Sequence, residues 1–176
     1  KCRTCNPNNS SLIAEEATKH SSLPLGINRW DGYRKYTWQE LDTLLPTIEN
    51  LDFFGGEPFL LKELKPFLQT AVETNHCQHI RLHFNTNGSI YPAGIIDNIQ
   101  KFKEVDIAVS IDDVGNRFEL TRGGNWSEVE ANILKLKSFE SDNFKVYIFP
   151  TVNVHNVLYL DELIDWADSH QIEYKL

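Results

Sequence analysis

Methionine is absent from the 176-residue sequence, and cysteine occurs only three times, at Cys2, Cys5 and Cys77. An odd number of cysteines does not make a disulfide framework, and a Cys-x-x-Cys pair in a reduced compartment more often binds a metal or performs redox chemistry. No apolar run approaches the roughly 18 residues of a membrane span, and no basic-then-apolar signal segment stands at the start. The chain opens at Lys1, which indicates a fragment. We expect a cytoplasmic protein without a membrane partner.

Basic residues are outnumbered: 17 Lys and Arg stand against 25 Asp and Glu, which leaves a formal net charge of −8. A large phosphate-backbone footprint needs clustered Lys and Arg, so the sequence has no strong nucleic-acid signature. Hydrophobic residues make up 41% of the chain and charged residues 24%, the balance of an ordinary globular protein. This length suits one domain with one substantial core, and we expect residues 1–176 to form it.

From about residue 37 onward, short apolar runs alternate with amphipathic stretches, which is the pattern of βα units around a parallel sheet. Strands are expected over residues 51–54, 79–84, 105–110, 145–149 and 172–174, with one more before Lys1. Helices are expected over residues 37–48 and 60–74, from Pro92, Asn125 and Asn156 onward, and as a short start at 12–14. The sequence therefore predicts an α/β fold.

Each of four successive predicted strands runs directly into a polar or glycine-bearing turn. The turns are Gly55-Gly56-Glu57-Pro58, Asn85-Thr86-Asn87-Gly88, Ser110-Ile111-Asp112-Asp113 and Thr151-Val152-Asn153. In barrels and open α/β sheets the active site lies at the carboxyl ends of the strands, so these turns should converge on one cleft. Any α/β protein needs turn residues after its strands, but four such turns in register favour a functional site.

The pair in Cys2-Arg3-Thr4-Cys5 fits three kinds of site by itself: half of a zinc site, a thioredoxin-type dithiol, or part of an iron-sulfur site. A thioredoxin motif needs a helix directly after the pair, which Pro7 fits poorly. A zinc site needs a second pair of ligands, for which Cys77 and scattered histidines are the candidates. Spacing alone therefore predicts metal or cluster ligation without choosing the metal.

Taken together, Cys2-x-x-Cys5 and the Gly55-Gly56-Glu57-Pro58 turn resemble the signature of the radical S-adenosylmethionine (SAM) superfamily. That signature is Cys-x-x-x-Cys-x-x-Cys, followed by a Gly-Gly-Glu motif that ends the next strand. Cys2 and Cys5 correspond to its second and third cysteines, and the first is expected at the third position before Lys1. The resemblance implies a partial (βα)6 TIM-like barrel, truncated here at both ends.

The resemblance also implies the cofactors and the chemistry. Three thiolates would hold a 4Fe-4S cluster and leave one iron to chelate the amino and carboxylate groups of SAM. Reductive cleavage of SAM would give methionine and a 5′-deoxyadenosyl radical, which abstracts hydrogen from the substrate. The protein supplies position and excludes water. An electron donor such as flavodoxin or ferredoxin is implied as a partner.

By the same resemblance, the turn of Gly55, Gly56 and Glu57 would receive the methionyl amino group of SAM. Thr86, in the second turn, and Asn153, in the fourth, would face SAM or substrate. The Thr-Asn-Gly wording of the second turn matches a turn that is common in the family after this strand. The Asn-Gly pair is equally a plain turn signal.

The segment Ser110-Ile111-Asp112 resembles the Ser-Ile-Asp of the SPASM and twitch subgroups, in which the serine hydrogen-bonds the methionyl part of SAM. The resemblance thereby places Ser110 and Asp112 at the SAM site. In those subgroups an arginine about a dozen residues further on clamps the SAM carboxylate, and Arg122 stands at that place. A guanidinium fork matches a carboxylate well. Arg117 is the competitor, and we expect its side chain on the surface.

Two other interpretations stay open: a thiol- or zinc-dependent α/β protein that uses only Cys2 and Cys5, and a non-catalytic binding module with the SAM-binding fold. A cysteine at the third position before Lys1 would favour the radical enzyme over both. The motifs look most like those of twitch-domain proteins, many of them from phages, whose auxiliary-cluster domain would lie beyond Leu176. The substrate stays open: a peptide, a nucleotide or another class.

Overall fold

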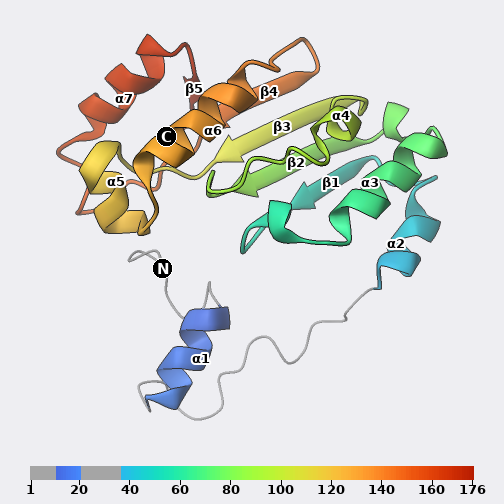
Figure 1. The fold of residues 1–176 in the computed structure, drawn as a ribbon, viewed down its shortest axis with the longest axis horizontal. Helices are drawn as coiled ribbons and strands as arrows, with labels where there is room; N and C mark the ends of the chain where they lie inside the picture. The colour runs from blue at the N-terminus through green and yellow to red at the C-terminus, as the bar shows by residue number, and fades with distance from the viewer. Residues whose placement is uncertain (1–10, 21–36) are drawn as a thin grey trace.

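A parallel sheet is the centre of the structure, a computed structural model that describes residues 11–20 and 37–176 (Figure 1). The strands are β1 (Asn50–Phe53), β2 (Arg81–Thr86), β3 (Glu104–Val109), β4 (Phe144–Ile148) and β5 (Glu173–Tyr174). The α-helices are α1 (Ser11–Lys19), α2 (Trp38–Leu44), α3 (Leu64–Glu73), α4 (Ile96–Ile99), α5 (Gly115–Arg122), α6 (Trp126–Lys137) and α7 (Leu160–Ser169). Two short 3-10 helices are η1 (Pro58–Leu60) and η2 (His76–Gln78).

Every strand runs parallel to its neighbours, and the order across the sheet, β1-β2-β3-β4-β5, follows the order along the chain. Parallel neighbours need a crossover from the end of one strand to the start of the next. Here α3, α4, α6 and α7 lie in the four crossovers, with α5 preceding α6. The predicted α/β fold with a parallel sheet is therefore confirmed. The further strand expected before Lys1 lies outside the sequence.

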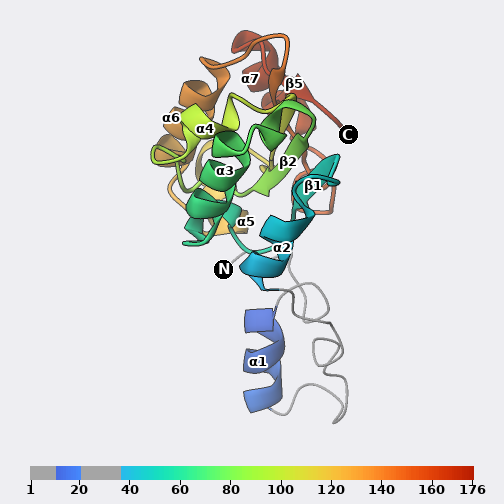
Figure 2. The same cartoon turned by 90° about the vertical axis from the view of Figure 1, so that its right-hand side faces the viewer.

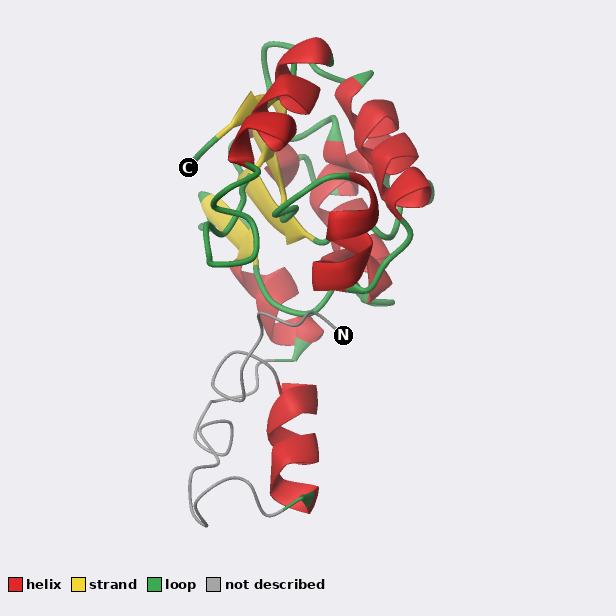
Figure 3. Cartoon of the chain, turned by 90° about the vertical axis from the view of Figure 1, so that its left-hand side faces the viewer, coloured by secondary structure: helices red, strands yellow, loops and turns green. Residues whose placement is uncertain are grey.

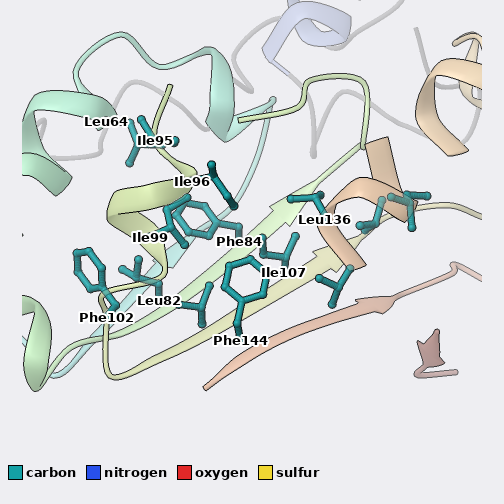
Figure 4. Packing of buried hydrophobic residues seen from close by; sticks show 14 of the residues in the cluster. Leu64, Leu82, Phe84, Ile95, Ile96, Ile99, Phe102, Ile107, Leu136 and Phe144 are labelled. Atoms are coloured by element: carbon teal, nitrogen blue, oxygen red, sulfur yellow. The ribbon is translucent and has the colours of Figure 1, made fainter. Parts of the chain in front are cut away.

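Side chains alternate between the two faces of the sheet, and the apolar ones face the helices. On β2, for example, Leu82 and Phe84 are buried while Arg81 is exposed and His83 is half-buried. Figures 2 and 3 show α3, α4 and α6 gathered on one side of the strands. The apolar side chains of these helices and of that sheet face form one core, part of which is drawn in Figure 4.

Local sequence explains where two of the helices begin. Thr37 caps α2 in a reciprocal capping box: the Glu40 N–H donates to the Thr37 hydroxyl oxygen at 3.2 Å, and the Thr37 N–H donates to the Glu40 carboxylate at 2.8 Å. Asn125 caps α6 by accepting a hydrogen bond from the Glu128 N–H at 3.1 Å. Both N-termini agree with the sequence prediction.

Four helical segments differ from the prediction. The helix expected from Pro92 onward is the short α4, which begins only at Ile96, after a turn in which the Pro92 carbonyl oxygen accepts from the N–H groups of Ile95 and Ile96. The helix expected over residues 60–74 is divided into η1 and α3, because Leu61 adopts an extended conformation between them. Helix α5 was not predicted from periodicity, since it has no apolar stripe and buries only Phe118 and Thr121. Helix α7 begins at Leu160 rather than near Asn156, because the Asn156 side chain is bonded within the preceding loop.

Candidate functional site

The carboxyl ends of β1, β2, β3 and β4 lie along one edge of the sheet because the strands are parallel (Figure 1). Gly55 and Gly56 lead the chain away from β1 with φ angles of 82° and 55°, left-handed conformations that glycine adopts readily. A Cβ atom added to either glycine would meet no heavy atom of the described residues within 4 Å. The backbone of this turn therefore borders open space, and a ligand can approach it closely.

Glu57 ties this turn to the end of β2. Its carboxylate accepts hydrogen bonds from the Thr86 hydroxyl, at 2.9 Å to each oxygen, and from the backbone N–H of Asn87 at 2.9 Å. It also accepts a longer bond of 3.3 Å from the N–H of Phe59, at the start of η1. Thr86 is buried, and its hydroxyl oxygen accepts from the N–H of Gly88 at 3.1 Å. Two of the four predicted turns are thus joined by a direct side-chain contact.

The environment of Glu57 perturbs its protonation. Burial raises the pKa of Glu57 above its ordinary value of 4.5, and the hydrogen bonds from Asn87, Thr86 and Phe59 offset part of that rise. A carboxylate that pays a desolvation cost gains when a positively charged donor is brought beside it. The chemistry that Glu57 offers at this edge is therefore acceptance of a hydrogen bond from a cationic group.

Replacing Glu57 with glutamine is expected to change how stability depends on pH. Because its pKa is raised on folding, the folded state binds a proton at a higher pH than the unfolded chain, whose Glu57 keeps the ordinary value. As pH falls through the folded pKa, the unmodified protein should therefore gain stability relative to Glu57→Gln. Urea unfolding of both proteins between about pH 7 and about pH 5 measures this difference. A difference that stays constant over the range would contradict the raised pKa.

Ser110 stands at the end of β3, next to the end of β2. Its backbone N–H donates to the carbonyl oxygen of Thr86 at 2.8 Å, which continues the ladder between the two strands. The residue is half-buried, and its hydroxyl makes no hydrogen bond within the part of the chain that the structure describes. A ligand at this edge can therefore use the Ser110 hydroxyl without displacing another partner.

Asp112 and Arg122 form a buried ion pair just beyond β3. Arg122 donates from Nε to Asp112 Oδ2 and from Nη2 to Asp112 Oδ1, both at 2.7 Å. The Asp112 side chain is fully buried and that of Arg122 is 16% exposed. The backbone N–H of Thr151 donates to the same carboxylate at 2.8 Å. One carboxylate thus connects the end of β3, the end of α5 and the turn after β4, which are parts of the third and fourth predicted turns.

This pairing separates the roles of the two residues. The two oxygens of Asp112 already accept three hydrogen bonds from the chain itself, so its carboxylate positions Arg122. A guanidinium has five N–H bonds, and three of those of Arg122 are not used by Asp112. Asp112 neutralises the charge of Arg122. Arg122 therefore offers a ligand directed hydrogen-bond donors and little net positive charge.

Asn156 is a buried residue of this edge that sequence reasoning missed. Its Nδ2 donates to the carbonyl oxygens of Asp112, at 2.8 Å, and Thr151, at 3.0 Å, and its Oδ1 accepts from the N–H of Asn153 at 2.7 Å. The Asn153 side chain bonds within its own loop, to the Thr151 carbonyl oxygen and from the His155 N–H. In the sequence, Asn156 has no signal that distinguishes it from an ordinary helix-start residue.

The Arg117 side chain lies at the surface, as expected, but it is held there by two ion pairs. Its Nε donates to Asp113 Oδ2 at 2.8 Å, its Nη2 pairs with Glu162 of α7, and its guanidinium carbon lies 4.3 Å from the centroid of the Tyr159 ring. The Arg117 side chain is 30% exposed and that of Asp113 is fully buried. The bond to Asp113, followed by that to Glu162, holds the pKa of Arg117 well above its ordinary range. Arg117 therefore anchors α5 to α7.

Fold and site together define a class of protein: a parallel α/β partial barrel with a candidate ligand-binding edge at the carboxyl ends of its strands. The structure brings Glu57 and Thr86 into contact, places Ser110 beside them through the backbone, and joins Asp112 to Arg122. The chain belongs to the radical SAM superfamily, because the family model described as "Radical SAM superfamily" matches residues 1–167.

Solved structures of Streptococcus suis SuiB share this fold. SuiB bound to S-adenosylmethionine matches with a TM-score of 0.61 and 14% identity, over 81% of this chain and 33% of the SuiB chain. SuiB bound to the precursor peptide SuiA matches with a TM-score of 0.60 and 14% identity, over 80% and 32% of the two chains. The chain thus spans about a third of the length of the SuiB chains, and the predicted partial (βα) barrel is confirmed. No curated protein sequence matches this chain at a significant level.

The residues at the strand ends fit the methionyl end of SAM, the cofactor that the family implies. That end has an ammonium group, which needs acceptors, and a carboxylate, which needs donors. Glu57 provides a half-buried acceptor beside the open glycine turn, and Ser110 and Arg122 have donors that the described chain leaves unused. Cys2 and Cys5, the residues predicted to bind the cluster, lie outside the described residues.

The remaining candidate metal ligands do not assemble in the described part of the chain. Residues 11–20 and 37–176 contain no group of three or more His, Cys, Asp or Glu side chains that could hold a metal ion. Cys77, one candidate for the second pair of zinc ligands, is buried in η2. Within those same residues, no helix combines the length and the apolar character needed to cross a membrane.

Proposed function

We propose that this chain is the SAM-binding core of a radical SAM enzyme of the SPASM- or twitch-like kind. The observation that carries the proposal is the edge of the sheet, where an open glycine turn and the half-buried carboxylate of Glu57 follow β1 and the unused hydroxyl of Ser110 follows β3, on either side of β2. Cys2 and Cys5 would bind the 4Fe-4S cluster. Together the two cofactors supply reductive cleavage of SAM and hydrogen abstraction from the substrate.

Different residues of the chain bind the ammonium group and the carboxylate of the methionyl end of SAM. Glu57 accepts a hydrogen bond from the ammonium group, and the bare backbone of Gly55 and Gly56 lets that group approach. Ser110, just after β3, and Arg122, at the end of α5, donate to the carboxylate. Because the donors and acceptors stand on different elements, the amino-acid end of SAM has one preferred orientation at this edge.

Two buried contacts hold these ligand-binding groups in place. Thr86 fixes the Glu57 carboxylate by donating to both oxygens, and Asp112 fixes the Arg122 guanidinium in a two-bond fork. Groups that are already oriented lose little conformational freedom when the ligand binds, which favours affinity. The chain thereby contributes position and orientation, while the cofactors supply the reaction.

Partners and substrate follow from the proposed class. An electron donor such as flavodoxin or ferredoxin would deliver the electron that cleaves SAM, and an auxiliary-cluster domain of the twitch kind would accompany the core. SuiB has been crystallised with its precursor peptide SuiA, so a peptide is the first substrate class to test here. Nucleotides are the second.

The experiment that tests the SAM site is a SAM titration, by calorimetry, of the cluster-loaded full-length protein and two variants. Ser110→Ala removes one neutral hydrogen bond and is expected to weaken SAM binding roughly two- to tenfold. Arg122→Lys retains a charge for Asp112 but loses the fork, and loss of a charge-assisted bond should weaken binding about ten- to a hundredfold. Formation of 5′-deoxyadenosine reports the activity.

Ser127→Ala is the matched control, because Ser127 lies exposed on α6 and its hydroxyl makes no hydrogen bond within the described residues. It should leave SAM affinity unchanged. SAM binding that is equally strong in Ser110→Ala, Arg122→Lys and Ser127→Ala would overturn the assignment of this edge. Arg117→Ala is unsuitable as a control, since Arg117 holds α5 to α7.

A further inference from the structure

The face of the sheet opposite the helices has ionisable side chains in one row across four strands. In the ladders, Asp52 is paired with His83, His83 with Asp106, and Asp106 with Lys145. Paired residues of neighbouring strands point to the same face of a sheet. These four side chains therefore lie side by side on the face that the apolar core does not use.

This row is unusual for the inner face of a barrel, which large branched apolar side chains ordinarily fill. Within the described residues, the side chains of Asp52, His83 and Asp106 make no hydrogen bond or ion pair with each other or with any other group. His83 and Asp106 are half-buried and Asp52 is exposed, and ionisable groups that are half-buried without partners lower stability. Their presence on three adjacent strands is therefore better explained by a ligand than by folding.

A cavity of about 190 Å³ opens on this face, and its lining includes Asp52, His83 and Asp106. Arg81 and Glu104 also line it, but they neutralise each other in an ion pair at 2.9 Å. Within the described residues Asp52 and Asp106 form no ion pair, although Lys145 on β4 is the ladder partner of Asp106. At about 30 Å³ for each water molecule in the liquid, the volume is that of about six waters. This is room for one side-chain-sized cationic group.

A second observation also favours a cation here. The Nζ atom of Lys175 lies 3.5 Å from the centroid of the Tyr147 ring, and that ring lies 6.5 Å from the ring of His83. Burial, and then the negative charges of Asp106 and Glu173, raise the pKa of Tyr147. An ammonium group of the chain itself thus sits on the same face, in a negative potential to which Asp106 contributes.

A third observation points to a hydrogen-bond donor on the ligand. Asn85 lies two residues beyond His83 on β2 and so faces the same side of the sheet. Its Oδ1 atom is buried and has no hydrogen-bond partner among the described residues. Buried acceptors are rarely left unpaired in proteins. Asn85 stands between the row and the carboxyl edge, where the body of a bound substrate would satisfy it.

We infer that this cavity binds a positively charged nitrogen group of the substrate, either an amine or a guanidinium. The group would lie between Asp52 and Asp106 and against His83. The inference rests on the proposed function, which places SAM at the carboxyl edge of the same sheet. Asp106 precedes Ser110 by four residues, a distance of about 13 Å at about 3.3 Å for each residue. A substrate that reaches from this row to the carboxyl edge of the sheet must therefore be elongated, spanning about 13 Å.

The test compares two probes of nearly equal shape, Nα-acetyl-L-argininamide and Nα-acetyl-L-citrullinamide, called argininamide and citrullinamide below. Acetylation removes the α-amine from both, and the second has a neutral ureido group in place of the guanidinium. Each is titrated into the full-length protein by NMR, with the His83 ring as reporter. Argininamide should bind at least about tenfold more tightly than citrullinamide. The Asp106→Asn substitution should weaken argininamide binding by about tenfold and leave the affinity for citrullinamide unchanged. Asp168→Asn makes the same charge change on the exposed surface of α7 and should alter neither.

Equal affinity of the two probes, or equal effects of Asp106→Asn and Asp168→Asn, would overturn the inference. SAM is titrated into the same proteins separately, so the two proposals fail in different measurements. Absence of SAM binding in the unmodified, cluster-loaded protein would overturn the proposed function. The probe titrations test only whether the cavity binds a cationic group.

Discussion

Replacing Asp112 with alanine is expected to lower the free energy of unfolding by about 3–5 kcal/mol, because it leaves a largely buried guanidinium without its carboxylate. Arg122 is only 16% exposed and donates two hydrogen bonds to Asp112 at 2.7 Å. The substitution also removes the acceptor of the Thr151 N–H. Urea unfolding followed by circular dichroism measures the change, with the midpoint falling at a nearly constant slope.

A matched control is the ion pair of Arg81 and Glu104, which has a similar length of 2.9 Å but side chains that are 55% and 41% exposed. Glu104→Ala should cost about 1 kcal/mol or less, since water screens and solvates exposed pairs. The double variant Asp112→Ala, Arg122→Ala should lose less stability than the sum of the losses in the two single variants. Each single variant leaves one charge buried without its partner, whereas the double variant removes both charges. Equal losses in Asp112→Ala and Glu104→Ala would show that burial of the pair contributes nothing.

Replacing either Cys2 or Cys5 with alanine is expected to abolish iron binding altogether. In the full-length protein reconstituted without oxygen, three thiolates should take up about four irons in one cluster, and a 4Fe-4S cluster is not held once one of its ligands is lost. Thiolate ligands select iron-sulfur and zinc over hard cations. Iron and sulfide analysis, together with the visible absorption of the reduced and oxidised protein, measures the loss.

Cys77→Ala is the control for this experiment, since Cys77 is buried in η2 and stands apart from the motif in sequence. It should retain the cluster. If the unmodified protein instead bound one zinc ion tightly and took up no iron, the proposed radical chemistry would be wrong and a zinc-dependent α/β protein would take its place. Loss of zinc in Cys77→Ala would then identify the third cysteine as a ligand.

Periodicity and turn chemistry in the sequence were enough to predict much of this molecule. Alternating apolar residues such as Leu82 and Phe84 marked a strand with one face in the core, because a strand turns successive side chains to opposite faces. The Thr37 and Asn125 caps are local contacts within three residues. Gly55 and Gly56 need positive φ angles at the point where β1 ends. Such features depend only on near neighbours in the chain.

The tertiary structure alone decided which charged groups meet. Arg117 and Arg122 lie on the same helix, yet the docking of α5 brings Arg117 to Glu162 of α7 and Arg122 back to Asp112. The loop before α7 likewise carries Asn156 to the end of β3. These pairings depend on how α5 and α7 dock on the sheet, which no local pattern encodes.

The open face of the sheet shows the same division. The sequence by itself determined that Asp52, His83 and Asp106 alternate with core residues, and therefore that each faces away from the helices. Only the register of the strands decided that the three lie in one row beside a cavity. Shifting one strand by two residues would keep every side chain on its face and still separate the row, because alternation defines the face and strand pairing defines the neighbour.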